Sequence, residues 1–215
     1  MNLFTIFITS LFIGLSGAVM PGPLLSLNIY NTIQKGIKGG LIIIIGHSIV
    51  EAIIVILLLS GVKQLFLREG VQGIIAITGG FVLVWMGINM LKSVKKINIQ
   101  FINPAENSYS SKQNSGIFQG ILATLSNPYW YIWWATVGLN YILLSKKTGI
   151  YGPFAFYFGH ISSDFLWYGV IAVLTAKGIQ KIKPSIYGSI VLILGVFLIF
   201  MGINFIIFGG NKLTS

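Results

Sequence analysis

The chain has 215 residues, of which 55% are hydrophobic and only 8% are charged, whereas soluble domains carry about a quarter charged residues. A chain this short cannot hide so much apolar surface in its own core, so the composition indicates an integral membrane protein. The absence of cysteine excludes a disulfide framework and thiol redox chemistry. The net charge of +10 is spread between apolar runs without a base-reading motif, which argues against nucleic-acid binding.

Six long apolar runs follow one another along the chain, and each is long enough to cross a bilayer as a helix of about 20 residues. The runs are continuously apolar, which favours helices over the alternating strands of a membrane barrel. Glu51 in the second run and Asp164 in the fifth are the only charged residues inside them. The runs comprise residues 1–34, 39–62, 70–91, 113–145, 148–176 and 184–211.

The first run is too long for one straight span, because residues 3–34 would form a helix of about 48 Å at ~1.5 Å per residue. Pro21-Gly22-Pro23 lies within it, and proline removes a backbone donor while glycine adds freedom. We expect a helix break here whose free backbone groups bind an ion or a substrate, or else a simple kink without a ligand. The run lacks a basic n-region, so we expect it to be retained and not cleaved as a signal peptide.

Two pairs of ionisable residues lie inside the runs. His47 and Glu51 are four residues apart and share one helix face, as do His160 and Asp164. A charge at the bilayer centre costs about 2.5–3.5 kcal/mol, so these acids are candidate proton carriers or sites for a substrate amine. Each pair is interpreted as a proton relay. The alternatives are a pair of metal ligands, or a histidine that only satisfies its neighbouring acid.

The most polar stretch, residues 94–113, is expected to be a basic linker between two units of three spans each, residues 1–93 and 114–215. The loops after the first, third and fifth runs hold nine of the 14 positive residues. The positive-inside rule therefore predicts that these loops are cytoplasmic and that both termini lie outside.

The fourth run contains Asn127-Pro128 where the first contains its prolines, and we expect a second helix break that completes a substrate crevice. The aromatic segment that follows, residues 129–134, is typical of an interfacial belt, with a cavity lining for cation–π contact as the alternative. Asn89 and Asn204 are expected to make interhelical hydrogen bonds.

The two halves of the sequence match each other in order. Gly46-His47 and Glu51 match Gly159-His160 and Asp164 at a separation of 113 residues, and residues 86–89 and 201–204 both read Met-Gly-Ile-Asn, 115 apart. Three spans per half give the halves opposite orientations. The sequence therefore predicts an all-α integral membrane protein of six transmembrane helices arranged as a 3+3 inverted repeat, the pattern of secondary transporters.

On these residues the chain resembles the LysE/RhtB amino-acid exporter superfamily over about 200 residues. The resemblance is carried by the early Pro-Gly-Pro, the glycine-rich start of the second run, the basic linker and the Asn-Pro of the fourth run. Val50-Glu51 stands where that family usually carries Gly-Asp, and His47 is not part of its common pattern. The resemblance implies proton-motive export of amino acids or their relatives. Distant cousins export cadmium or nickel and cobalt, and the thiol-shuttling cousins need paired cysteines that are absent here.

We therefore predict a multi-pass transporter of the cell membrane that exports an amino acid or related small metabolite by proton antiport. We expect no enzymatic activity and no cofactor. Its partners would be the small-molecule substrate, protons and the lipid bilayer, without nucleic acid, and a homodimer is a candidate assembly. The alternatives are a divalent-metal exporter that uses the two His–acid pairs, and an intramembrane enzyme or assembly factor. The candidate pathway residues are Glu51, Asp164, His47, His160, Pro21, Gly22, Pro23, Asn127 and Pro128.

Overall fold

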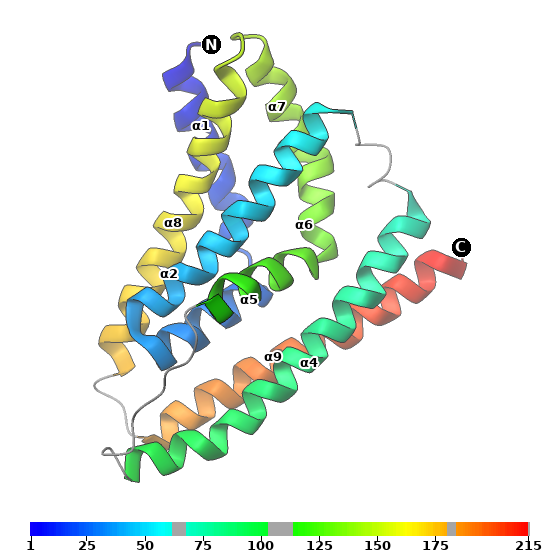
Figure 1. The fold of residues 1–215 in the computed structure, drawn as a ribbon. Helices are drawn as coiled ribbons and strands as arrows, with labels where there is room; N and C mark the ends of the chain where they lie inside the picture. The colour runs from blue at the N-terminus through cyan, green and yellow to red at the C-terminus, as the bar shows by residue number, and fades with distance from the viewer. Residues whose placement is uncertain (62–67, 103–113, 180–183, 215) are drawn as a thin grey trace.

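The computed structural model of the chain describes residues 1–61, 68–102, 114–179 and 184–214 (Figure 1). All regular elements in these ranges are helices. Most of the predicted linker, residues 103–113, lies outside the described residues, as do several lysines of the topology prediction, namely Lys63, Lys112, Lys181 and Lys183.

Each half of the chain begins with a broken helical segment and ends with one long helix. The first half consists of α1 (Leu3–Ala18), α2 (Pro23–Leu59) and α4 (Glu69–Ile102). The second half consists of α5 (Asn114–Leu125), α6 (Pro128–Trp133), the π-helical turn η2 (Trp134–Gly138), α7 (Leu139–Lys146), α8 (Gly152–Ile179) and α9 (Pro184–Thr214). Residues 94–102, expected to belong to the linker, are part of α4.

Both predicted helix breaks are confirmed. One separates α1 from α2 at residues 19–22, and the other separates α5 from α6 at residues 126–127. Pro23 and Pro128 each open the following helix. The first position of a helix tolerates proline, because the amides of the first turn have no intrahelical acceptor in any case. The first and fourth apolar runs therefore each form more than one helix.

A sharp bend divides α2 at Gly36, whose φ of 70° and ψ of −169° are accessible to glycine and to almost no other residue. The bend turns residues 23–35 back, so that Asn28, Asn31 and Thr32 lie against Gly39 and Gly40. Across it, the Asn28 side-chain amide donates a hydrogen bond to the Gly40 carbonyl at 3.1 Å. A Cβ at Gly40 would overlap the Thr32 hydroxyl, so a glycine there permits the close approach.

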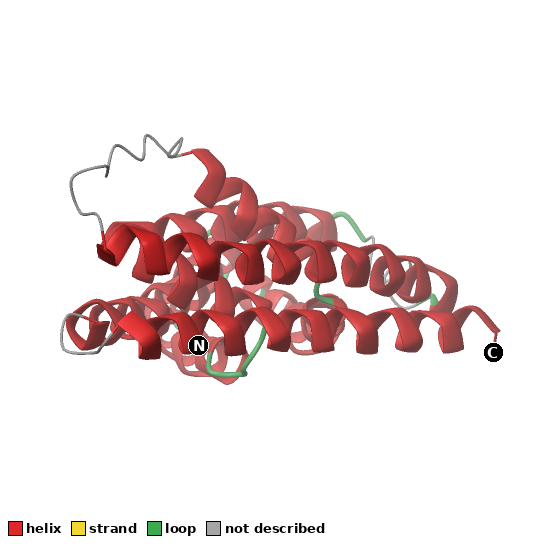
Figure 2. Cartoon of the chain, turned by 90° about the horizontal axis from the view of Figure 1, so that it is seen from below, coloured by secondary structure: helices red, strands yellow, loops and turns green. Residues whose placement is uncertain are grey.

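α4 and α9 lie along each other as an antiparallel pair (Figures 1 and 2). Glycines recur every seven residues on both helices and face one another. A Cβ at any of them would overlap a backbone carbonyl or a side chain of the other helix, so the stripe lets the two backbones approach closely. The facing pairs are Gly73 with Gly209, Gly80 with Gly202, and Gly87 with Gly195.

The remaining long contacts join the two halves in matching ways. α1 packs on α8, α5 packs on α2, and α2 also contacts α8. Gly159 of α8 lies against the Phe7 carbonyl of α1, and Gly46 of α2 lies against the Ile117 carbonyl of α5. Gly46 and Gly159 are matched positions of the sequence repeat. In each half, therefore, the glycine at this matched position contacts the first helix of the other half.

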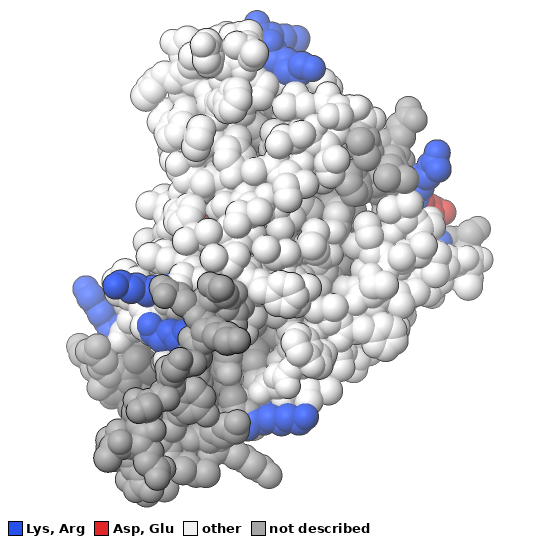
Figure 3. All heavy atoms as spheres, viewed as in Figure 1, with Lys and Arg blue, Asp and Glu red and all other residues white. Residues whose placement is uncertain are grey.

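Three of the described helices are long and apolar enough to cross a membrane, judged by length and composition: Pro23–Leu59, Glu69–Lys92 and Gly188–Thr214. Leu3–Ala18 and Gly116–Leu125 are shorter apolar helices. On the face shown in Figure 3, positive side chains sit at the edges of the molecule and leave a broad uncharged surface between them, which suits contact with lipid. The arrangement of six spans stays a prediction.

The predicted interhelical hydrogen bond is wrong for Asn204. Its side-chain amide donates to the Phe200 carbonyl of its own helix at 2.8 Å. A short polar side chain within a helix can bond to the backbone carbonyl of its own helix one turn earlier. Asn89 lines a small cavity of about 210 Å³ together with residues of α2 and α5.

Candidate functional site

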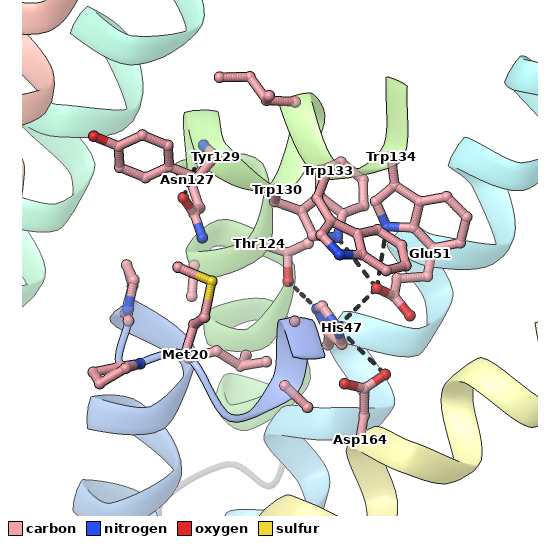
Figure 4. Close-up of a pocket in the computed structure, with 18 of the residues that line it drawn as sticks. Met20, His47, Glu51, Thr124, Asn127, Tyr129, Trp130, Trp133, Trp134 and Asp164 are labelled. Atoms are coloured by element: carbon pink, nitrogen blue, oxygen red, sulfur yellow. Dashed lines mark hydrogen bonds and ion pairs between the residues drawn. The ribbon is translucent and has the colours of Figure 1, made fainter. Parts of the chain in front are cut away.

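Four ionisable side chains meet where α2 contacts α8, and we call them the His–acid cluster: His47, Glu51, His160 and Asp164. Figure 4 labels three of them, His47, Glu51 and Asp164. Glu51 Oε1 lies 3.0 Å from His47 Nε2 and 3.1 Å from His160 Nε2. Asp164 Oδ2 lies 3.8 and 3.9 Å from the same two nitrogen atoms. All four residues are at most 6% exposed. The spacing of four within each pair gives both members one helix face, and the contact of α2 with α8 brings the two faces together.

Two tryptophans complete the surroundings of Glu51. Trp130 and Trp134 each donate an indole N–H to Glu51 Oε1 at 3.2 Å, and both are buried. The interpretation of this segment as an interfacial belt is therefore wrong for these two residues. Their spacing of four, which aims both rings from one helix face, is the signal that could have identified them. Trp134 also opens the π-helical turn, a rare geometry that is frequent at functional sites.

Thr124, which the sequence analysis did not single out, fixes the orientation of the His47 ring. Its hydroxyl donates to the Gly120 carbonyl at 2.8 Å, so its oxygen accepts from His47 Nδ1, also at 2.8 Å. We therefore assign the Nδ1 proton to His47. Glu51 Oε1 accepts hydrogen bonds from two indoles, so this oxygen carries no proton that it could donate to His47 Nε2. The contact between Nε2 and Oε1 is therefore best explained if Nε2 also carries a proton, which makes the pair an imidazolium and a carboxylate.

A cavity of about 350 Å³, here called the central cavity, has the His–acid cluster in its wall (Figure 4). Both helix breaks contribute to the same cavity, through Pro21, Gly22 and Pro23 on one side and Asn127 on the other. Pro128 is buried at the start of α6 and is not a lining residue. The structure thus brings eight of the nine candidate residues to one cavity.

Several buried polar atoms of the cluster have no hydrogen-bond partner among the described residues, namely Glu51 Oε2, Asp164 Oδ2 and His160 Nδ1. A buried acceptor without a donor costs about 1–3 kcal/mol, and more when it is charged. Of these atoms, the two carboxylate oxygens can receive hydrogen bonds from an ammonium group, or bind a proton or a metal cation. Three residues, His47, Glu51 and Asp164, each offer a metal-ligand atom within 4.8 Å of one another. Chemically, the site suits a cation.

The role of Thr124 can be measured. Thr124→Val leaves the buried His47 Nδ1–H without an acceptor, which costs about 1–3 kcal/mol, so we expect transport to fall by about 5- to 150-fold and its pH dependence to change shape. Thr124→Ser keeps the hydroxyl and should restore most of the rate and the original pH profile. Initial export rates at pH 5 to 8 provide the test. A rate lost equally in both variants would indicate a packing role instead.

Comparison with known proteins identifies one family. The model of the LysE type translocator family matches residues 15–209. Searches of curated proteins and of solved structures gave no significant match. The matched range contains both helix breaks and the whole His–acid cluster. Because the match covers most of the chain and agrees with its apolar helices, the chain belongs to the LysE type translocator family and is a multi-pass transport protein of the cell membrane.

Proposed function

We propose that the protein exports an amino acid or a closely related small metabolite across the cell membrane in exchange for protons. The observation that carries this proposal is the buried His–acid cluster in the wall of the central cavity. A cavity beside helix breaks is a recurring form of substrate site in secondary transporters. The cluster adds groups that exchange protons to that site.

Charge balance supports the coupling. If both imidazoles of the cluster carry a proton, they neutralise the two carboxylates, and the cluster without substrate has no net charge. A substrate ammonium brings a further positive charge into a buried site, where an unbalanced charge is costly. The ammonium is therefore accommodated when a proton leaves. The substrate ammonium and a proton on an imidazole therefore compete to balance the charge of the same carboxylates, which is the competition that antiport requires.

The architecture proposed with this function is six spans in two inverted halves, residues 1–93 and 114–215. It is supported by the equivalent contacts of α1 with α8 and of α5 with α2, together with the ordered sequence matches. In such an arrangement the crossing of α2 and α8 lies on the pseudo-two-fold axis near the midplane, and the substrate site lies at the interface of the halves. The lysine-rich loops would face the cytoplasm.

Efflux from proteoliposomes tests the function. Vesicles are loaded with radiolabelled amino acids and an internal pH dye, and the exterior is acidified. We expect accelerated efflux of at least one amino acid, accompanied by acidification of the interior that protein-free vesicles do not show. If no amino acid leaves faster across the pH gradient, the proposal is wrong.

Divalent-metal export is the second candidate function, because three residues of the cluster place ligand atoms within 4.8 Å of one another. Imidazole and carboxylate ligands suit zinc and neighbouring metals. Against it, both indole donors occupy Glu51 Oε1, and most of the cavity wall is apolar. Saturable binding of Zn²⁺ that His47→Ala removes, in a protein that binds no amino acid, would decide for the metal.

A further inference from the structure

A groove of about 610 Å³ lies between the end of α2 and the start of α8, and we call it the lateral groove. It shares no lining residue with the central cavity. Ile56 of α2 and Phe154 and Phe158 of α8 form part of its wall, and each of these residues is more than half exposed. The groove therefore opens on the outside of the molecule, where a membrane protein meets lipid.

One charged side chain lies in this otherwise uncharged groove. Lys146, the last residue of α7, is the only charged residue that lines it within the described part of the chain, so no acidic side chain there balances its charge. The tyrosine hydroxyl of the groove is already used, because Tyr157 donates a hydrogen bond to the Ser48 carbonyl at 2.9 Å. The groove therefore offers a ligand an apolar wall and one positive charge.

Lys146 also lies where the chain leaves the apolar helices. α7 ends at this residue, residues 147–151 form a turn, and α8 begins at Gly152 (Figure 1). Turns between apolar helices lie at the boundary of the membrane, at the depth of the lipid headgroups. A charged headgroup in this layer and an acyl chain in an apolar groove are the two parts that a phospholipid provides.

The charge of Lys146 decides which phospholipid fits. The acyl chains of the bilayer are as apolar as the groove, so the wall alone does not select one lipid over another. Each basic residue at the membrane surface strengthens the binding of an anionic lipid by about 5-fold. We propose that the lateral groove is a binding site for an anionic phospholipid. One acyl chain lies along Ile56, Phe154 and Phe158, and the anionic headgroup lies beside the Lys146 ammonium group.

This lipid site adjoins a contact that positions the His–acid cluster. The hydrogen bond of Tyr157 joins the start of α8 to α2 at Ser48, the residue that follows His47. A lipid in the groove packs against the side of Tyr157 and covers this contact. A ligand that binds the folded protein alone stabilises it. The bound lipid therefore stabilises the contact of α2 with α8.

Two neighbouring lysines provide a matched pair of variants. Lys146→Gln removes the charge that lines the groove. Lys147→Gln makes the same chemical change one residue later, on an exposed side chain that does not line the groove. Both substitutions lower the net charge of the protein equally. A difference between them therefore measures the groove and not the general attraction of a basic protein for anionic lipid.

The absence of native cysteine makes a local measurement possible. Phe158→Cys, labelled with bimane, reports quenching by brominated acyl chains in the groove, and Phe81→Cys does so on the exposed surface of α4, away from the groove. The full chain is reconstituted in nanodiscs of phosphatidylcholine and phosphatidylglycerol, and either lipid carries the bromine. At position 158, phosphatidylglycerol is expected to compete about 5-fold better than phosphatidylcholine. At position 81, the two lipids should quench equally.

The lysine variants are then compared with the label at position 158. Lys146→Gln should remove the preference for phosphatidylglycerol, and Lys147→Gln should keep most of it. Equal quenching by the two lipids without a lysine substitution overturns the proposed site. Equal loss of the preference in both lysine variants, or an equal preference at positions 81 and 158, overturns it as well, because the attraction would then be general. The readout needs no substrate, so its result is independent of the export function.

Discussion

Glu51→Gln is expected to abolish proton-coupled export, with a loss of at least about 100-fold in rate. Glu51 Oε1 gathers two indole N–H groups and lies within 3.1 Å of two imidazole nitrogen atoms. The neutral amide removes the charge that balances the buried histidines, and breaking one side of a buried charge pair costs about 3–5 kcal/mol. The measurement is substrate efflux from proteoliposomes under an imposed pH gradient. Asp164→Asn should act in the same direction.

A matched control is available at Glu69, where the same chemical change falls on an exposed residue. Glu69 pairs with Lys212 at 2.6 Å at the surface, and exposed ion pairs contribute little to stability. Glu69→Gln should therefore insert and export within about twofold of the wild-type rate. Normal export by Glu51→Gln, at normal levels of inserted protein, would show that the cluster is structural and that the proposed coupling is wrong.

Gly202→Val is expected to destabilise the pairing of α4 with α9 more than any exposed substitution. A Cβ at Gly202 would lie within 2.6 Å of the Gly80 carbonyl oxygen and 2.8 Å of a Val84 methyl group, so the two helices would have to separate. Overpacking of a close contact typically costs about 1–3 kcal/mol and occasionally more. Thermal unfolding of the purified protein in detergent, followed by circular dichroism and size-exclusion chromatography, measures the loss.

Gly210 of the same helix provides the control, because a Cβ there would meet no atom within 4 Å. Gly210→Val makes the same chemical change without the clash, and its unfolding temperature should stay close to that of the wild type. If both valine variants unfold at the same lowered temperature, the glycine stripe does not hold the helices together and the effect comes from helix propensity alone.

The geometry of the candidate site could be predicted in part, because periodicity and repetition are local properties of the sequence. The spacing of four within each His–acid pair predicted that its two members share one helix face, and the match between the halves gave the pairs equivalent positions in the repeat. The tryptophan donors to Glu51 were not predicted, since a dense aromatic segment suits a lipid interface as well as a buried wall. Only the hydrogen bonds of Trp130 and Trp134 to Glu51 of α2 distinguish the two. The roles of these residues in transport stay predictions.

The helix breaks were predictable because proline acts on its own backbone. The bend at Gly36 was not, because the sequence offers Gly36, Gly39 and Gly40 within one turn and does not say which of them takes positive φ. The continuation of α4 to residue 102 was also missed. Polar residues there suggested a linker, whereas lysine and glutamine have high helix propensity and allow a helix to continue.

The bend at Gly36 makes residues 23–35 a separate helical segment about 20 Å long, at ~1.5 Å per residue. One end of this segment, at Pro23 and Leu24, lines the central cavity, and the other end lies at the surface near Lys35 and Lys38. The bend itself is at Gly36, which has no side chain, and a Cβ at this position would meet no atom within 4 Å. Residues 23–35 thus connect the cavity to the surface around Lys35 and Lys38 through one continuous helical segment, and Leu24 and Leu27 of this segment belong to the same hydrophobic cluster as residues of α4 and α9.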